Sequence, residues 1–393
     1  MLEVNSCIIG GTRVTFGENA VSCLPEAIHR LGGTKALLIV DPNVIQTPGY
    51  HRIADALSAA KTAYEVYDRV IPNAYTHCVN EAAQKAKQCN CDIIVAIGGG
   101  STLDTGKSCS ILACHEGSLT DYLPDNGKPF SAKKLPLITI PTTSGTGSEM
   151  STYAVHTITE TGEKFSFNSQ QFTSNEVILD PDLPTYAPMP VVVSTATDAL
   201  VHAIEAYMSK WAVNHPFPYI DALALKSISL IHTTLPLLCA DPGNLEHRMS
   251  MMFAASISGA IIGYGVTAAH GMDSMLIHHY GTAHGEAVGG LIPAVMDYNR
   301  NECPERLRNI AEAMGVNTSG LTDQQASDAA INAVVQLLKD AGLPSLKALI
   351  PSSDDLCSHA EEVVDSYSCV ENIRPMGLKE IREILFNAYE KYY

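Results

Sequence analysis

Four histidines crowd into a short, otherwise apolar and glycine-flanked stretch of the sequence. His270, His278, His279 and His284 fall within fifteen residues, although the whole chain has only 14 histidines. Core packing does not explain imidazoles at this density. Imidazole nitrogens are common ligands of borderline divalent cations such as Fe²⁺ and Zn²⁺. We therefore expect some of these rings to bind a metal ion.

A carboxylate and an imidazole stand four residues apart, at Asp198 and His202. In an α-helix this spacing puts both side chains on one face, within reach of one cation. The alternative is structural, because Asp198 also stands three residues after Thr195 and could be the acidic partner of a capping box. Three imidazoles and one carboxylate together would hold Fe²⁺ or Zn²⁺ and leave a position open for a substrate oxygen.

Three consecutive glycines, Gly98 to Gly100, follow an apolar run and precede a helical pattern. Because glycine has no Cβ, backbone N–H groups here can approach a ligand closely, and the helix behind them presents its positive end. A diphosphate fits such a site. The segment is neither a G-x-G-x-x-G fingerprint nor a P-loop, since Ser101 stands where a P-loop needs glycine. A purely structural turn is the alternative.

A second loop, residues 141–149, is rich in hydroxyl and small side chains and follows another apolar run. Two such loops at the ends of neighbouring strands favour a dinucleotide ligand. Asp41 ends the first predicted strand, where a carboxylate can accept hydrogen bonds from ribose hydroxyls and repel a 2′-phosphate, which favours NAD over NADP. The alternatives are a solvated loop and, for Asp41, a simple turn residue before Pro42.

The elements that must position these residues divide the chain in two. The first part alternates apolar β-branched runs with helical patterns, which is typical of βαβ units and a mostly parallel sheet. We predict strands at residues 36–40, 92–97, 137–140 and 177–179, and helices that include residues 51–61 and 80–89. After residue 184 the patterns are helical only. We therefore predict an α/β dinucleotide-binding domain over residues 1–185 and an all-helical, metal-binding catalytic domain over residues 186–393.

The composition excludes several classes of protein. The chain has 393 residues, of which 46% are hydrophobic, and a formal net charge of −17 from 42 acidic and 25 basic residues. Such a chain can form two packed cores, and its charge opposes binding to nucleic acid. Eleven cysteines without a C-x-x-C pair, and no basic-then-apolar segment at the N-terminus, favour a reducing, cytoplasmic location. The longest uncharged run, residues 253–269, predicts a buried helix rather than a membrane span.

With these motifs in order, the chain resembles the iron-activated (group III) alcohol dehydrogenases, the family that includes lactaldehyde reductase and 1,3-propanediol dehydrogenase. The match spans about residues 5 to 390 and rests on the glycine loop with Asp104 and Lys107, on the loop at 141–149, and on the Asp and His pattern. The resemblance implies a Rossmann-like N-terminal domain, an all-helical C-terminal domain in a dehydroquinate synthase-like architecture, and a cleft between them. It also implies a homo-oligomer, at least a dimer.

The resemblance further implies which residues form the site. The four metal ligands would be Asp198, His202, His270 and His284. The residues expected to contact NAD are Asp41, Asn73, Gly98, Gly99, Gly100, Ser101, Asp104, Thr142, Thr143, Thr146 and Lys164.

One departure from the family pattern concerns the proton relay. Many members have a histidine four residues after the third metal ligand, and this chain has Ser274 there. The proton must then be carried by Ser274, His278, a cofactor ribose hydroxyl or water. His278 lies two helical turns after His270 and could share its face, whereas His279 is rotated away.

The expected reaction is reversible hydride transfer between NAD(H) and a small polar aldehyde or its primary alcohol, with the metal polarising the substrate oxygen. Substrates to consider range from alkanals and lactaldehyde to anions such as sulfoacetaldehyde, phosphonoacetaldehyde or succinic semialdehyde. Alternatives are a glycerol dehydrogenase-like polyol oxidation and a dehydroquinate synthase-like lyase, although few Lys and Arg surround the expected ligands. A non-catalytic metal-binding protein would need neither loop.

Overall fold

The computed structural model describes residues 3–123 and 128–392. The chain folds into two compact units. The sheet unit comprises residues 1–143 and 147–187, and the helical unit comprises residues 144–146 and 188–393.

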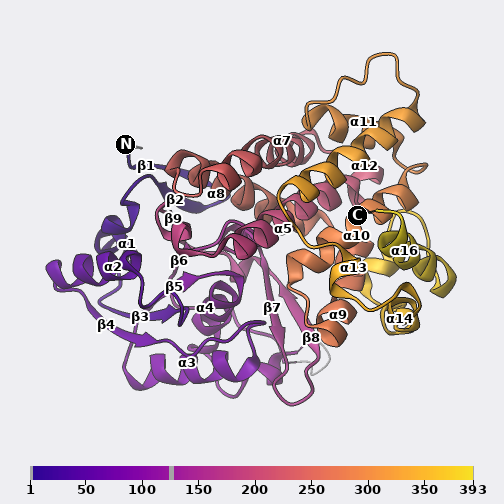
Figure 1. Cartoon of the computed structure of the whole chain (residues 1–393). Helices are drawn as coiled ribbons and strands as arrows, with labels where there is room; N and C mark the ends of the chain where they lie inside the picture. Colours follow the sequence, from indigo (N-terminus) through magenta and orange to yellow (C-terminus); the bar gives the residue numbers. More distant parts are fainter. Residues whose placement is uncertain (1–2, 124–127, 393) are drawn as a thin grey trace. The chain divides into compact units, whose positions relative to one another are not determined.

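A seven-stranded sheet forms the centre of the sheet unit (Figure 1). Five of its neighbouring pairs are parallel, and only β1 and β2 pair antiparallel. The parallel ladders place the C-terminal ends of β3, β5 and β6 at one edge of the sheet, where open α/β sheets bind ligands. In spatial order the strands are β1 (Asn5–Ile9), β2 (Thr12–Phe16), β9 (Glu176–Leu179), β6 (Leu137–Pro141), β5 (Ile93–Gly98), β3 (Lys35–Val40) and β4 (Ala63–Tyr67).

Helices cover both faces of this sheet. On β5, Ile94 belongs to a core shared with α3 and α4, whereas Ile93 and Val95 belong to a core shared with α1 and α2. Successive side chains of a strand point to opposite faces, so a strand covered on both sides is apolar throughout. These helices are α1 (Leu24–Arg30), α2 (Pro48–Ala59), α3 (Thr76–Gln88) and α4 (Gly100–Leu112).

The sheet unit also contains an antiparallel hairpin and short 3₁₀ turns. The hairpin strands are β7 (Tyr153–Thr157) and β8 (Lys164–Asn168), and β7 lies beside α4. The 3₁₀ turns are η1 (Ala20–Cys23), η2 (Leu119–Tyr122), η4 (Ser148–Met150), η5 (Gln170–Phe172) and η6 (Leu183–Tyr186).

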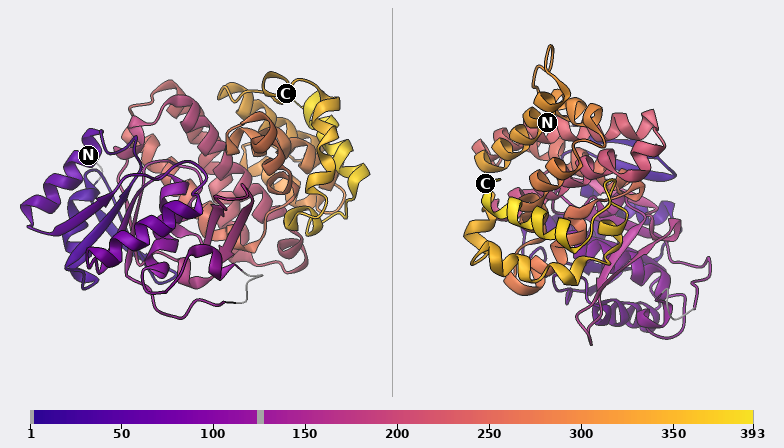
Figure 2. Two further views of the ribbon diagram at one scale, coloured as in Figure 1. Left: turned by 90° about the horizontal axis from the view of Figure 1, so that it is seen from below. Right: turned by 90° about the vertical axis from the view of Figure 1, so that its right-hand side faces the viewer.

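In its described residues the helical unit contains helices and no strand. The long helix α5 is buried along most of its length and packs against α7, α8 and α10. The C-terminal helix α16, yellow in Figure 2, packs against α10 and α14. The elements are α5 (Met189–Met208), α6 (Lys210–Asn214), α7 (Pro218–Ala240), α8 (Leu245–Ile261), η7 (Ile262–Tyr264), α9 (Ala268–Tyr280), α10 (His284–Asn299), α11 (Pro304–Ala313), α12 (Asp323–Asp340), α13 (Leu346–Leu349), α14 (Ser353–Ser358), η8 (Ala360–Val363), α15 (Tyr367–Val370) and α16 (Leu378–Glu390).

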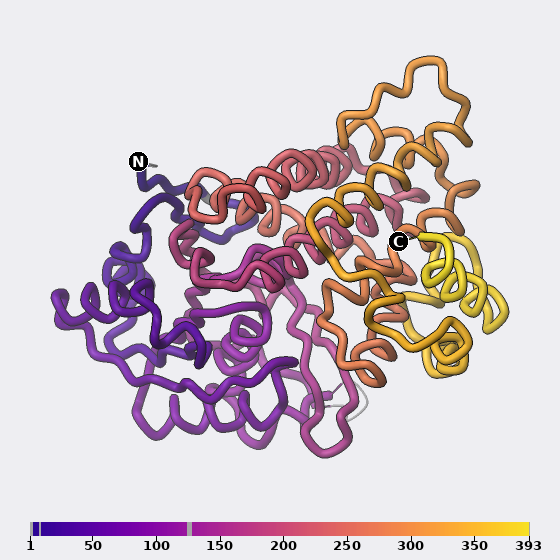
Figure 3. The backbone as a smooth tube through the Cα atoms, in the orientation of Figure 1, coloured from indigo at the N-terminus to yellow at the C-terminus, as the bar shows by residue number. Residues whose placement is uncertain are grey.

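The uncharged run at residues 253–269 is not the single helix that we expected. Its helix α8 ends at Ile261, a 3₁₀ turn follows, and α9 begins at Ala268 with a change of direction of 107° between the two segments (Figure 3). Gly265 lies in the break with φ of +133°, a conformation that glycine adopts readily and side-chain-bearing residues rarely do. The break places the start of α9 beside α5, where the Thr267 hydroxyl and the Ala269 amide donate to Glu205.

Among the described residues, α7 alone is a single helix long and apolar enough to cross a membrane. It packs against α5 and α8 within the helical unit, and 39% of its most apolar window is buried. The predicted fold class is confirmed: a mostly parallel α/β part is followed by a helical part.

Candidate metal centre and cofactor loops

Helix α5 carries the first two expected metal ligands. Asp198 and His202 lie in the middle of this helix, which begins at Met189, and both are buried. Thr195 also lies inside the helix, where its hydroxyl donates to the carbonyl of Val192 at 3.2 Å. The capping-box alternative for Asp198 is therefore wrong, since no helix starts at Thr195.

The other two ligands lie at the starts of α9 and α10. His270 is the third residue of α9, and His284 is the first residue of α10. Each is followed by a glycine that permits close packing. A Cβ on Gly285 would lie 1.8 Å from the carbonyl oxygen of Ser194 on α5, and a Cβ on Gly271 would lie 2.6 Å from Cys369 Sγ. The glycines that flank the histidines thus let α9 and α10 approach their neighbours.

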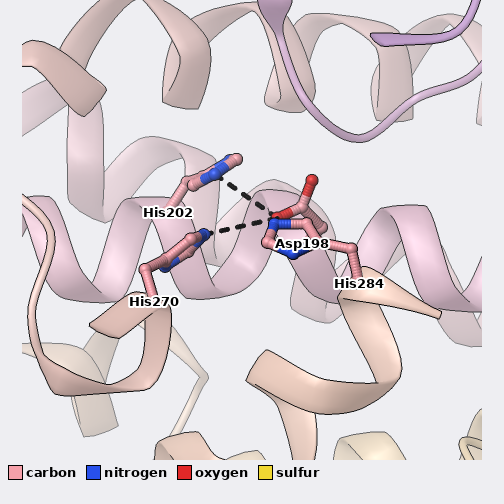
Figure 4. Close-up of side chains that lie close together, drawn as sticks. All are labelled: Asp198, His202, His270 and His284. Atoms are coloured by element: carbon pink, nitrogen blue, oxygen red, sulfur yellow. Dashed lines mark ion pairs between the residues drawn. The ribbon is translucent and has the colours of Figure 1, made fainter. Parts of the chain in front are cut away.

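The four side chains converge on one point, as Figure 4 shows. The Nε2 atoms of His202 and His284 each lie 3.3 Å from Asp198 Oδ1, and the Nε2 atom of His270 lies 3.7 Å from it. Asp198 Oδ1 and His270 Nε2 are buried and make no hydrogen bond. Polar atoms that are buried without partners are costly unless something satisfies them.

These distances fit a metal ion rather than hydrogen bonds. Ligand bonds of 2.0–2.2 Å in a tetrahedral site put neighbouring ligand atoms about 3.4 Å apart. The observed separations of 3.3–3.7 Å match that edge and exceed the usual N–H···O length. The side chain of His284 is 38% exposed, against 3–11% for the other three, so the site is open on the His284 side.

Two acidic residues that the sequence analysis did not single out hold the outer nitrogens of the histidine rings. Glu205 Oε2 lies 2.5 Å from His270 Nδ1, and Asp273 Oδ2 lies 2.9 Å from His284 Nδ1. A carboxylate can only accept, so each Nδ1 carries a proton and each Nε2 is left to bind a metal. Glu205 also accepts from the Thr267 hydroxyl at 2.5 Å and the Ala269 amide at 3.0 Å, which fixes the start of α9.

The electrostatics of the cluster follow from burial and from these carboxylates. Burial lowers the pKa of His202 to about 4, so this ring is neutral. Burial also acts to lower the pKa of His270, but Glu205 and Asp198 outweigh it and raise this pKa to about 10. Burial acts to raise the pKa of Asp198, and the neighbouring imidazoles outweigh it, so this pKa is well below its usual value. The cluster is built to hold positive charge beside Asp198.

Both candidate proton carriers lie on the exposed side of α9. Ser274 and His278 are exposed, and the ring of His278 contacts that of His279 at a centroid distance of 4.7 Å. Neither belongs to the group of converging ligand atoms. Their role in proton transfer stays a prediction.

In the sheet unit, the glycine loop joins the C-terminal end of β5 to α4. Gly98 ends the strand, Gly99 is the N-cap and Gly100 is the first helical residue. A Cβ on Gly98 would lie 2.6 Å from Thr102, so packing requires glycine there. A Cβ on Gly99 would meet only the Thr143 side chain, at 3.4 Å and beyond. The space beside Gly99 lies next to the amides at the start of a thirteen-residue helix, which suits an anion.

Other expected cofactor residues gather around this loop. Asp41 directly follows β3, and its Cβ lies 3.0 Å from the point where a Cβ on Gly98 would lie. One carboxylate oxygen of Asp41 accepts from the amide of Asn43 at 2.8 Å. The amide of Asn73 donates to the Ser101 hydroxyl at 3.0 Å, so these two lie together.

The second loop runs beside the first. The amide of Thr142 donates to the carbonyl of Gly98 at 3.0 Å, and Thr143 faces Gly99. Thr146 falls in the short segment 144–146 that belongs to the helical unit, where the Cβ position of the neighbouring Gly145 lies 2.5 Å from Thr195. Lys164 is the first residue of β8 and pairs with Thr157.

Asp104 and Lys107 act in the structure as supports of the second loop and of β7. Asp104 accepts from the Ser148 hydroxyl at 2.5 Å and from the Val155 amide at 2.9 Å. Lys107 is fully buried, and its ammonium donates to the carbonyls of Ser151 at 3.1 Å and Tyr153 at 2.7 Å. Burial lowers the pKa of Lys107 to about 8, with the Asp104 carboxylate acting against this effect. Both side chains join α4 to the residues after the second loop.

His156 is a third residue that the sequence analysis missed. It is fully buried on β7, with Nε2 2.7 Å from the Ser108 hydroxyl of α4 and Nδ1 2.9 Å from the carbonyl of Ala74. Asn73 and Ala74 have φ of +72° and +46°, an unfavourable backbone for residues with side chains. His156 therefore anchors the turn that places Asn73 against Ser101.

Comparisons with known proteins show the family to which the chain belongs. The model of the family "Iron-containing alcohol dehydrogenase" matches residues 11–181, and that of its C-terminal part, "Fe-containing alcohol dehydrogenase family, C-terminal", matches residues 192–389. The choline dehydrogenase of Bacillus subtilis (strain 168) is 35% identical over 372 residues, which cover 94% of this chain and 91% of that protein.

Two solved structures match nearly the full length. A 1,3-propanediol oxidoreductase has a TM-score of 0.90 and 33% identity, with 99% of this chain and 100% of that chain covered. The sulfoacetaldehyde reductase of Bifidobacterium kashiwanohense, solved in complex with NAD⁺, has a TM-score of 0.84 and 24% identity, with 100% and 99% covered.

Proposed function

Because the chain belongs to the iron-containing alcohol dehydrogenase family, we propose that it is a metal-dependent, NAD(H)-linked alcohol dehydrogenase that interconverts a small polar aldehyde and its primary alcohol. The observation that carries the proposal is the convergence of three imidazole Nε2 atoms on one oxygen of Asp198. A protein that only binds metal would need neither the glycine loop at Gly98 to Gly100 nor the loop at residues 141–149.

The residues of the cluster have distinct tasks in this proposal. Asp198, His202, His270 and His284 hold a divalent ion, Fe²⁺ or Zn²⁺, which supplies a Lewis acid for the substrate oxygen when it is bound. Glu205 and Asp273 keep the Nδ1 protons in place, so that the rings keep their orientation. His284 stands at the exposed side, where a substrate oxygen can approach.

We propose NAD as the hydride carrier. The amides around Gly99 and Gly100, at the N-terminus of α4, would hold its diphosphate. Asp41, beside Gly98, would accept from the adenosine ribose and repel the 2′-phosphate of NADP. The proposed division of labour assigns cofactor binding to residues 1–185 and metal binding to residues 186–393. We also propose a homo-oligomer in the cytoplasm.

The charge of the metal centre favours a neutral or cationic substrate. Asp198, Glu205 and Asp273 contribute three negative charges, and one divalent ion with neutral imidazoles leaves the centre with one excess negative charge. The matched relatives are named for a diol, a cationic alcohol and an anionic aldehyde, so family membership leaves the charge of the substrate open. We therefore rank uncharged C2–C4 aldehydes first, then the aldehyde of choline, then sulfoacetaldehyde.

The test is a panel of aldehydes assayed with NADH on protein whose metal content has been measured. The panel contains lactaldehyde and 3-hydroxypropanal as neutral members, betaine aldehyde as the cation, and sulfoacetaldehyde and succinic semialdehyde as anions. We expect NADH oxidation with a neutral member at the highest kcat/KM. No oxidation with any member, or no dependence on metal, would contradict the proposal.

The His270→Ala variant provides the control. It should lose most activity and the ion held by the cluster around Asp198, because it removes one of the four ligands of that cluster. Full activity in a metal-free His270→Ala protein would end the proposal. A lyase of the dehydroquinate synthase type would instead turn over a phosphorylated sugar acid without net oxidation of NADH, which the same spectrophotometric assay distinguishes.

A further inference from the structure

A second group of metal-ligating side chains lies in the helical unit, apart from the cluster around Asp198. His279 stands near the end of α9, His359 follows the last residue of α14, and Glu362 lies in η8. One ligand atom from each lies within 4.8 Å of the others. His270, at the opposite end of α9, belongs to the first cluster, so α9 carries one member of each group.

The three side chains already contact one another. His279 Nε2 lies 2.9 Å from both carboxylate oxygens of Glu362, and His359 Nδ1 lies 3.0 Å from Glu362 Oε1. The rings of His279 and His359 stack with centroids 3.6 Å apart at an angle of 20°. Two imidazoles therefore share a single carboxylate.

The surrounding elements hold this arrangement in place. The hydroxyl of Tyr280, the last residue of α9, donates to Asp355 of α14 at 2.8 Å, and α9 packs against η8. His359 and Glu362 stand one turn apart. Two parts of the chain, α9 and the segment from His359 to Glu362, thus bring the ligand atoms together before an ion binds.

The stacked rings of His279 and His359 must turn away from each other to accept an ion, because the metal-binding lone pair of an imidazole lies in the plane of its ring. Tetrahedral coordination with ligand bonds of 2.0–2.2 Å requires separations of about 3.4 Å, so each nitrogen must retreat from the carboxylate by about 0.4–0.5 Å and the rings must tilt apart. The side chains of His279, His359 and Glu362 are 25%, 24% and 48% exposed, which gives them freedom to move and gives an ion a path from solvent.

We propose that His279, His359 and Glu362 form a second site that binds a borderline divalent cation such as Zn²⁺ through two imidazoles and one carboxylate, with water completing the coordination. The site is independent of the proposed catalytic function. Its occupation ties the end of α9 to α14 and η8, and so stabilises the helix that carries His270. The cation is bound only in the folded chain, and it therefore raises the unfolding temperature.

The test counts zinc ions on the full-length, metal-stripped protein with a competing chromogenic chelator. We expect two ions per wild-type chain, and one in each of the His279→Gln and His359→Gln variants. The matched control is His215→Gln. His215 is an exposed histidine directly after α6, where its ring contacts the carbonyl of Trp211, and the variant should still bind two zinc ions. One ion per wild-type chain, or two in both His279→Gln and His359→Gln, would overturn the proposal.

A second measurement distinguishes this site from the cluster around Asp198. In a His270→Ala background, Zn²⁺ should still bind with a stoichiometry near one and raise the unfolding temperature. The double variant His270→Ala, His279→Gln should show neither effect, whereas His270→Ala, His215→Gln should show both. Equal thermal shifts in the two double variants would place the zinc elsewhere and refute the assignment.

Discussion

Replacing Glu205 by glutamine tests the part of the metal centre that lies behind the ligands. Glu205 is fully buried and accepts three hydrogen bonds: from the Thr267 hydroxyl and the Ala269 amide at Oε1, and from His270 at Oε2. Glutamine has nearly the same shape but only one accepting oxygen. The Ala269 amide is a fixed donor, so the glutamine oxygen must take the Oε1 position and its NH₂ group must face His270.

That arrangement selects the wrong tautomer of His270. An NH₂ group facing Nδ1 requires an unprotonated Nδ1, and the proton of the neutral ring then sits on Nε2, the atom that faces Asp198. Loss of such an outer partner weakens metal binding about 10- to 100-fold, or about 1.4–2.7 kcal/mol. We expect Glu205→Gln to weaken Zn²⁺ binding within this range and to recover part of its activity at saturating metal.

The assay is a chelator competition that measures the dissociation constant of the ion held by the cluster around Asp198. The kcat/KM is then measured at saturating metal. Glu286→Gln is the control, because Glu286 lies two residues from His284 but bonds only the Ala283 amide in a capping interaction that glutamine supports. A dissociation constant for Glu205→Gln within threefold of the wild-type value would refute the tautomer argument. An equal loss in Glu286→Gln would show a general structural effect instead.

Three further predictions concern the sheet unit. Asp41→Gly should shift the kcat/KM ratio about tenfold toward NADP, because it removes the carboxylate beside Gly98; an unchanged ratio would show that Asp41 is not the selector. His156→Phe should raise the dissociation constant of NAD severalfold in calorimetry while metal content stays constant, since Ala74 loses its anchor, and His156→Gln should restore part of the affinity. Lys107→Met should change the pH dependence of stability. The pKa of Lys107 is about 8 in the folded chain against 10.5 unfolded, so burial costs about 3 kcal/mol below pH 8 and this cost disappears as pH rises toward 10.5. The unfolding temperature of Lys107→Met relative to wild type should therefore fall between pH 7 and pH 10, and a difference that stays constant over this range would contradict the lowered pKa of Lys107.

The central strands, the Asp198 and His202 pair and the histidine-rich stretch were accessible from sequence because short-range patterns record them, whereas the choice of His270 and His284 among those histidines came from the family resemblance. The strands at 36–40, 92–97, 137–140 and 177–179 are covered on both faces and are apolar apart from Asp92 and Thr139, and each agrees with an observed strand to within one residue at either end. Asp198 and His202 are four apart on one helix. The histidines between 270 and 284 are dense enough to attract notice without a structure.

What sequence could not supply depends on long-range contacts. Glu205 meets His270 from 65 residues away, and nothing local indicates that partner. A signal was present, because an acid seven residues after Asp198 falls on the same helix face in an apolar sequence. The strands β1, β2 and β4, toward the two edges of the seven-stranded sheet, and β7 and β8, which form a separate hairpin, were missed because their apolar residues are interspersed with polar ones. The start of α2 was placed three residues late, although Thr47 caps it ahead of Pro48.

The most direct test of the central claim is the return of activity on adding metal to stripped protein. NADH oxidation with the best aldehyde is followed while Fe²⁺ or Zn²⁺ is added in fractions of an equivalent. If Asp198, His202, His270 and His284 hold the ion that the reaction needs, the rate should rise from near zero in proportion to the ion bound by these four residues. The rate should not recover in the His202→Gln variant. An undiminished rate in the stripped wild-type protein would contradict the account.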